Sequence, residues 1–157
     1  MICDIDGELE DTVGTSSYAF FSPKNSQAVI SGRAGEYQPW EHASSTRQEL
    51  FGQLGVQYWM SRFCQWWGIP RNKVYLTLIT DSQVSIDIIQ NLSEMVGIKN
   101  SLKPEMDVAF ELYQLRLTHF WLLWNVIRVE SHIDESEASA EFNWACNEYV
   151  DALATKA

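Results

Sequence analysis

The chain has 157 residues, enough for one domain with a single core that needs no disulfide or structural metal. It contains 21 acidic and 11 basic residues, and this net charge of −10 argues against a protein that grips nucleic acid mainly by global charge. There is no apolar run of eighteen residues and no secretory leader pattern, so the sequence predicts a soluble intracellular protein without a membrane span. We expect residues 1–157 to form one domain.

The three cysteines are scattered along the chain. Cys3, Cys64 and Cys146 form no CxxC motif and no Cys/His ligand spacing. An odd, scattered set in an intracellular protein is typical of reduced thiols. We therefore expect all three to serve as core or near-core residues.

The first part of the chain predicts three antiparallel strands followed by a long helix. MICDID (1–6) alternates in polarity, and the β-rich segments SSYAFFSP (16–23) and SQAVISGRAG (26–35) are separated by Pro23-Lys24-Asn25. A helical pattern then runs over 46–67 and ends at Gly68-Ile69-Pro70. The apolar residues of this helix recur at three- and four-residue steps, at Leu50, Phe51, Leu54, Tyr58, Trp59 and Phe63.

The second part predicts further strands and helices in alternation. A strand over 74–80 precedes a helix over 82–95, and another helix begins near Pro104. WNVIRVES (124–131) is typical of a last strand, and a polar stretch over 133–141 leads to a terminal helix over 142–154. This order predicts an α/β (mixed α+β) fold: a five-stranded mixed sheet, with three antiparallel strands and two parallel ones, flanked by helices.

Acidic residues from four separate elements can converge on one edge of this sheet. Ligands of open sheets gather at the carboxyl ends of parallel strands, where Asp6 and Asp81 would both lie. Glu49 lies in the first turn of the long helix, and Asp151 lies on the terminal helix. Five acids crowd residues 4–11 and seven lie within 130–151, so a bound cation would relieve their repulsion if the two ends meet.

A carboxylate cluster of this kind suits hard divalent cations. Mg²⁺ takes oxygen ligands and is commonly held by a few carboxylates together with water and substrate phosphate. Two such ions about 4 Å apart activate a water and stabilise the leaving oxygen of an in-line displacement at phosphorus. The four acids therefore predict phosphodiester hydrolysis.

Two of these acids also suit a purely structural role. Asp81 stands where a helix N-cap is expected, and a carboxylate there accepts bonds from free backbone N–H groups. Glu49 completes the pattern Thr46-x-x-Glu49, which is that of a capping box.

Alternatives also remain for the other positions. Asp4 shares a strand face with Asp6 and is an alternative ligand, although Gly7 allows a close approach at Asp6. Asp151 follows Asn147 by four residues on one helical face, a position that is ordinarily exposed to solvent. His132 lies in a loop after the last strand, and His119 has no acidic partner in sequence and is interpreted as structural.

Together these segments resemble the type 1 ribonuclease H family over nearly the whole chain, from Ile2 to Ala154. TDSQ (80–83) and the form N-E-x-x-D-x-L-A are specific when they occur in this order. The fourteen residues between His132 and Asn147 are similar to what is expected of ribonuclease H domains of retrotransposon-type reverse transcriptases. The other matching segments are Asp6-Gly7, STRQEL (45–50), SHID (131–134) and NEYVDALA (147–154).

The resemblance implies a ribonuclease H-like fold and an endonuclease that cuts the RNA strand of RNA/DNA hybrids. It implies two Mg²⁺ ions as cofactors, with Mn²⁺ as a substitute. By this resemblance His132 takes the place of a mobile histidine that assists proton transfer or product release. Ser45, Thr46 and Gln83 match positions that touch the minor groove of the hybrid, where RNA is generally recognised. The metal-binding carboxylate positions fall on Asp6, Glu49, Asp81 and Asp151.

Departures from the family pattern bear on metal and hybrid binding. Glu8 stands where serine is common and adds a carboxylate near the site. Where some members carry a basic helix, this chain offers only Lys99 and Lys103, so we expect weak unaided binding of the hybrid. Met1 stands immediately before the first strand, and an upstream reverse transcriptase domain is the expected partner.

Two other functions remain open. Asp6-Gly7-Glu8 also matches the D-x-E of proofreading-type 3′–5′ exonucleases, but Asn147 stands where such enzymes need a histidine or tyrosine. A ribonuclease H-like module that has lost catalysis is a third possibility. The acidic surface and Glu8 favour it, whereas the four carboxylates and His132 oppose it.

Overall fold

A computed structural model describes most of the chain. The described residues are 2–10, 13–22, 24, 27–37, 44–70, 73–95, 103, 105–118, 123–130 and 142–155, without the side chains of 2–10, 13, 36, 37, 123, 124 and 142–144. The predicted polar stretch 133–141, His119, His132 and Lys99 lie outside the described residues. None of the described helices combines the length and apolar character needed to cross a membrane.

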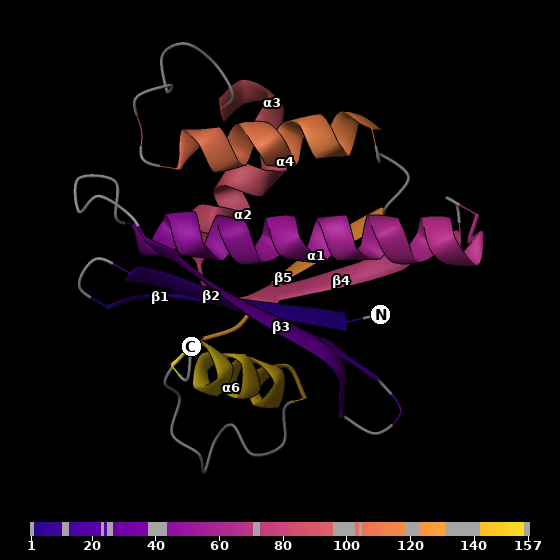
Figure 1. Cartoon of the computed structure of the whole chain (residues 1–157), viewed down its shortest axis with the longest axis horizontal. Coiled ribbons are helices and arrows are strands. Elements are labelled where there is room, and N and C mark those ends of the chain that lie inside the picture. The colour runs from indigo at the N-terminus through magenta and orange to yellow at the C-terminus, as the bar shows by residue number, and fades with distance from the viewer. Residues whose placement is uncertain are drawn as a thin grey trace.

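The strands form a mixed sheet in the order β3-β2-β1-β4-β5 (Figure 1). β1 pairs antiparallel with β2, and β2 pairs antiparallel with β3. β4 runs parallel to both β1 and β5. The sheet therefore changes from antiparallel to parallel pairing at β1. The mixed α/β architecture is thereby confirmed. The strands are β1 (Ile2–Glu10), β2 (Val13–Phe21), β3 (Ala28–Tyr37), β4 (Tyr75–Thr80) and β5 (Leu123–Arg128).

Helices cover both faces of the sheet (Figure 1). α1 (Ser45–Trp67), α2 (Gln83–Gln90), α3 (Leu92–Met95) and α4 (Met106–Thr118) lie on one side, and α6 (Phe142–Ala154) lies on the other. The larger buried cluster packs between the sheet and the four-helix side, and it includes Phe20, Leu50, Leu78 and Leu112. A smaller cluster lies under α6 and contains Ala19, Phe21, Ile79, Val129, Cys146 and Val150.

Cys64 and Cys146 are buried thiols outside any disulfide, as the sequence predicts. Burial raises the pKa of the Cys64 thiol, which keeps it in the uncharged form. The side chain of Cys3 lies outside the description.

Several element boundaries differ from the prediction, including those of β1, α2 and β5. β1 does not end at Asp6, because its pairing with β2 continues to Glu10 opposite Val13. The predicted helix over 82–95 is interrupted at Asn91, whose side-chain amide donates to the carbonyl of Asp87 and ends α2. β5 ends at Arg128, three residues before the predicted limit.

The buried face of α1 combines apolar and polar residues. Val56, Met60 and Cys64 lie in the core, together with the polar Gln53, Gln57 and Ser61. Of the apolar residues that recur along the helix in the sequence, Leu50 is also in the core, and Phe51, Leu54, Trp59 and Phe63 pack against it. Tyr58 is 45% exposed.

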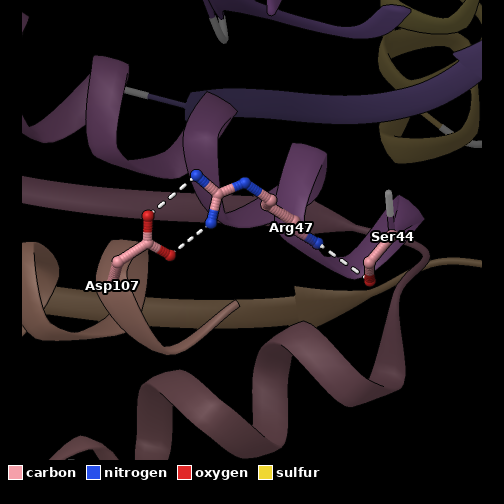
Figure 2. A network of polar contacts seen from close by, with 3 residues as sticks. All are labelled: Ser44, Arg47 and Asp107. Atoms are coloured by element: carbon pink, nitrogen blue, oxygen red, sulfur yellow. Dashed lines mark hydrogen bonds and ion pairs between the residues drawn. The ribbon is translucent and has the colours of Figure 1, made fainter. Parts of the chain in front are cut away.

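One ion pair joins the first turns of α1 and α4 (Figure 2). Ser44 caps α1 by accepting from the backbone N–H of Arg47. The Arg47 guanidinium donates through both terminal nitrogens to the two carboxylate oxygens of Asp107, with Nη2–Oδ2 at 2.8 Å. It also lies over the ring of Phe51, 5.5 Å from the centroid. This bidentate bond to Arg47 lowers the pKa of Asp107.

We predict that Asp107→Asn lowers the free energy of unfolding by about 1 kcal/mol at neutral pH, because Asp107 is 66% exposed and solvent screens the pair. The lowered pKa means that the carboxylate contributes stability above its unfolded pKa of about 3.9, and that this contribution is lost as pH falls through the folded value. The difference from the parent should therefore shrink below about pH 4 in urea titrations. Glu111→Gln, on the exposed side of α4, is the control. Equal losses in both variants would contradict the assigned role.

Candidate functional site

A buried hydrogen bond joins the end of β4 to the first turns of α1. Thr80 Oγ1 donates to Glu49 Oε2 at 3.0 Å, and both residues are buried. The backbone N–H of Ser82 in turn donates to Thr80 Oγ1 at 3.3 Å. The start of α1, the end of β4 and the start of α2 therefore meet at one edge of the sheet.

Glu49 is not a capping residue. The N-cap of α1 is Ser44, so the predicted box between Thr46 and Glu49 is wrong. The Glu49 side chain instead lies against Thr80 and is only 4% exposed. Burying a carboxylate costs free energy unless hydrogen bonds or a cation compensate for lost water. The bond from Thr80 compensates for part of this cost, and a bound cation would add further compensation.

Asp81 does not cap α2 either. Ser82 is the N-cap, and its Oγ accepts from the backbone N–H of Ser85 at 3.3 Å. The backbone carbonyl of Asp81 accepts from Arg128 Nε at 3.3 Å, whereas its carboxylate forms no hydrogen bond or ion pair with the described part of the chain. The half-buried carboxylate is therefore available for another ligand.

Strand register brings the backbone of Asp6 to the same edge. The parallel pairing of β1 and β4 aligns Ile2 with Thr77 and ends with Asp4 beside Ile79. Asp6 and Asp81 each stand two residues beyond this last pair, so they lie at one level of the sheet. Asp4 lies two residues before that level, beside Ile79. The register therefore favours Asp6 over Asp4, the alternative that the sequence left open.

α6 reaches this region from the opposite face. Ser17, the cross-strand partner of Asp6, donates from Oγ to the carbonyl of Val150 at 2.8 Å in a buried bond. Asp151 follows directly and is half-buried, contrary to the solvent-facing position expected for it alone. Asn147 Nδ2 donates to both Asp151 carboxylate oxygens, at 3.3 and 3.4 Å.

The donor atoms present fit a hard divalent cation. Glu49, Asp81 and Asp151 supply carboxylate oxygens, and the buried Asn147 Oδ1 has no hydrogen-bond partner among the described residues. Such an oxygen set is the kind that Mg²⁺ and Mn²⁺ prefer. Among the side chains that the structure describes, no three His, Cys, Asp or Glu residues are already gathered as a metal site. The Asp6 side chain and His132 lie outside that description.

The predicted substrate contacts lie at the start of the same two helices. Ser45 is exposed and Thr46 is half-buried in the first turn of α1. Gln83 is exposed in the first turn of α2 and donates from Nε2 to Asp87 Oδ1 at 2.8 Å. All three therefore stand in the first turns of helices whose starts meet at this edge of the sheet.

The chain is similar to known proteins in its structure but not detectably in its sequence. No family model and no curated protein matches this sequence. Solved structures do match. The N-terminal RNase H domain of Rv2228c from Mycobacterium tuberculosis, solved as a fusion with maltose-binding protein, aligns with a TM-score of 0.62 at 13% identity, over 99% of this chain and 90% of that one.

The chain has a ribonuclease H-like fold. LC11-RNase H1, solved in complex with an RNA/DNA hybrid, aligns with a TM-score of 0.66 at 11% identity, over 99% of this chain and 94% of that one. Prototype foamy virus protease-reverse transcriptase aligns with a TM-score of 0.70 at 11% identity. This alignment covers 99% of this chain and 20% of the viral protein.

The assignment of Ser82 as the cap predicts different effects for two neighbouring substitutions. Ser82→Ala should lower the free energy of unfolding by about 1 kcal/mol, because α2 loses its cap. Asp81→Asn should leave metal-free stability unchanged or raise it, because it removes a negative charge near other carboxylates. Denaturant unfolding in EDTA measures both. A clear loss of stability in Asp81→Asn alone would make Asp81 the structural residue instead.

Proposed function

We propose that the domain is a metal-dependent endonuclease that hydrolyses the RNA strand of RNA/DNA hybrids. The carrying observation is the hydrogen bond from Thr80 to Glu49, which brings the first helix to the strand end where Asp81 stands. The backbone of Asp6 and the α6 segment around Asp151 reach the same region through the register of β1 and the bond from Ser17. The shared fold with LC11-RNase H1, itself solved with a hybrid, supports this substrate class.

In this proposal Asp6, Glu49, Asp81 and Asp151 hold two Mg²⁺ ions, which Mn²⁺ can replace. Bound there, the ions would supply an activated water and a stabilised leaving oxygen for displacement at phosphorus. His132 assists proton transfer or product release. Ser45, Thr46 and Gln83 contact the hybrid from the first turns of α1 and α2, through its wide minor groove and the RNA 2′-hydroxyls.

The chain's own hydrogen bonds prepare these carboxylates. Thr80 directs the Glu49 carboxylate toward the strand end, and Asn147 keeps the Asp151 carboxylate close to α6. Ser82 is the N-cap of α2, so the Asp81 side chain does not have to leave a capping hydrogen bond in order to bind an ion. Side chains held in place in this way reduce the cost of ordering ligands when an ion and substrate bind.

We further propose that residues 1–157 form one such domain of a retroelement reverse transcriptase. The fold corresponds to one fifth of the foamy virus protease-reverse transcriptase. A net charge of −10 weakens attraction to nucleic acid phosphates, so an upstream reverse transcriptase domain would supply much of the affinity for the hybrid.

Cleavage of an end-labelled RNA/DNA hybrid tests the proposal. In Mg²⁺ or Mn²⁺ the parent should cut the RNA strand internally and leave single-stranded RNA, duplex RNA and duplex DNA intact. Asp81→Asn should lower the cleavage rate by about a hundredfold or more, because a ligand of the reacting centre is lost. Glu94→Gln removes one negative charge from exposed α3 and should keep the parental rate.

Two results would contradict the proposed function. Folded parent protein that leaves the hybrid intact in both metals, at concentrations where it binds the hybrid, would identify a module without catalysis. Cleavage that survives Asp81→Asn would place the reacting centre elsewhere.

A further inference from the structure

The outer face of α1 carries an exposed row of aromatic and basic side chains. Tyr58, Arg62 and Trp66 follow one another at four-residue steps and therefore lie along one side of the helix, in what we call the α1 stripe. Tyr58 is 45% exposed and Trp66 is 83% exposed, and Arg62 between them is exposed as well. Trp67 and Lys73 are exposed just beyond it.

The charge around the stripe is opposite to that of the chain. Residues 50–80 contain Arg62, Arg71 and Lys73 and no acidic residue, although the whole chain has a net charge of −10. Of these basic residues, Arg62 and Lys73 are described by the structure, and both are exposed. Their positive charge attracts phosphate groups, whereas the net negative charge of the chain repels them.

The stripe stands on a rigid base. Phe20 in β2 packs against Trp59 with 4.6 Å between ring centroids, and Trp59 stacks on Phe63 at 5.0 Å. Phe63 in turn contacts Trp67 at 6.3 Å. Gly68 then closes the helix with φ 62°, a conformation that favours glycine. This ladder anchors the end of α1 to the core and fixes the neighbouring Trp66 on the outside.

The stripe lies away from the proposed cleavage site. Trp66 follows Glu49 by seventeen residues along one continuous helix, which corresponds to about 26 Å at 1.5 Å per residue. Figure 1 shows the two ends of α1 at opposite sides of the molecule. The proposed carboxylate site therefore does not account for the exposed aromatic rings.

We propose that the α1 stripe binds a single strand of nucleic acid. Unpaired bases stack on Tyr58 and Trp66, and Arg62 and Lys73 pair with phosphates. Aromatic faces beside positive charges are the usual means of binding single strands without base specificity. The absence of acids over 50–80 favours a polyanion over a protein partner of mixed charge.

The inference rests on the stripe alone and not on the proposed function. It nevertheless complements that function, because removal of RNA from a hybrid leaves an unpaired DNA strand. A site for this strand on the same domain would keep the DNA strand bound after the RNA has been cleaved.

Binding of a fluorescently labelled fifteen-nucleotide oligo(dT) to the full chain tests the proposal, by anisotropy at about 50 mM salt and above. Trp66→Ala should weaken binding about tenfold, because stacking of one base contributes about 1–3 kcal/mol. Arg62→Ala should reduce the slope of log K against log salt by about 0.7, since one phosphate contact is lost. Oligo(dT) should also quench tryptophan fluorescence in the parent and less so in Trp66→Ala.

Two matched controls locate the effect. Phe110 on α4 is also 45% exposed but has Asp107 and Glu111 beside it, so Phe110→Ala should leave affinity unchanged. Glu94→Gln, which removes one exposed negative charge from α3, should also bind normally. No binding by the parent, or equal weakening by Trp66→Ala and Phe110→Ala, would overturn the proposal. A third result would also overturn it: the parent self-associates with rising concentration and does not bind oligo(dT), and Trp66→Ala abolishes this self-association. The stripe would then be a contact between copies of the chain.

Discussion

The hydrogen bond between Thr80 and Glu49 is the interaction on which the arrangement of the site depends. It is buried, it joins elements 31 residues apart, and it sets the start of α1 against the end of β4. The bond gives the buried Glu49 carboxylate a donor that offsets part of its lost hydration. The same threonine accepts from Ser82 and so fixes the turn that carries Asp81 into α2. One hydroxyl group thus positions two of the four proposed carboxylates.

A comparable hydrogen bond holds α6 against the opposite face of the sheet. Ser17 reaches from β2 to the backbone of α6 at Val150, next to Asp151 and across the strand from Asp6. The apolar cluster that includes Cys146 and Val150 keeps α6 on this face. The backbone of Asp6 and the α6 segment around Asp151 are thereby brought to the same region, where a bound cation would relieve repulsion between negative charges. The same acidity restricts attraction of nucleic acid to local basic regions such as the α1 stripe.

Element types followed from periodicity and turn residues, but the roles of neighbouring polar residues did not. Serine and threonine occur together at the start of α1, and aspartate and serine occur together at the start of α2. Each of these residue types can cap a helix. Backbone conformation selects Ser44 and Ser82, which sequence spacing cannot reveal. The sequence pattern of α1 likewise did not reveal that the polar Gln53, Gln57 and Ser61 are buried. Thr80 and Ser17 escaped notice, since their partners are distant in sequence and only strand register brings them near.

The proposed function requires that Asp6, Glu49, Asp81 and Asp151 form one divalent metal site. Paramagnetic broadening of backbone amide signals by substoichiometric Mn²⁺ in the isotopically labelled chain tests for this site. Broadening should be centred on Asp6, Glu49, Asp81 and Asp151, with their sequence neighbours affected less. Broadening centred instead on exposed acids of the helical layer, such as Asp87 or Glu111, would contradict the proposed site.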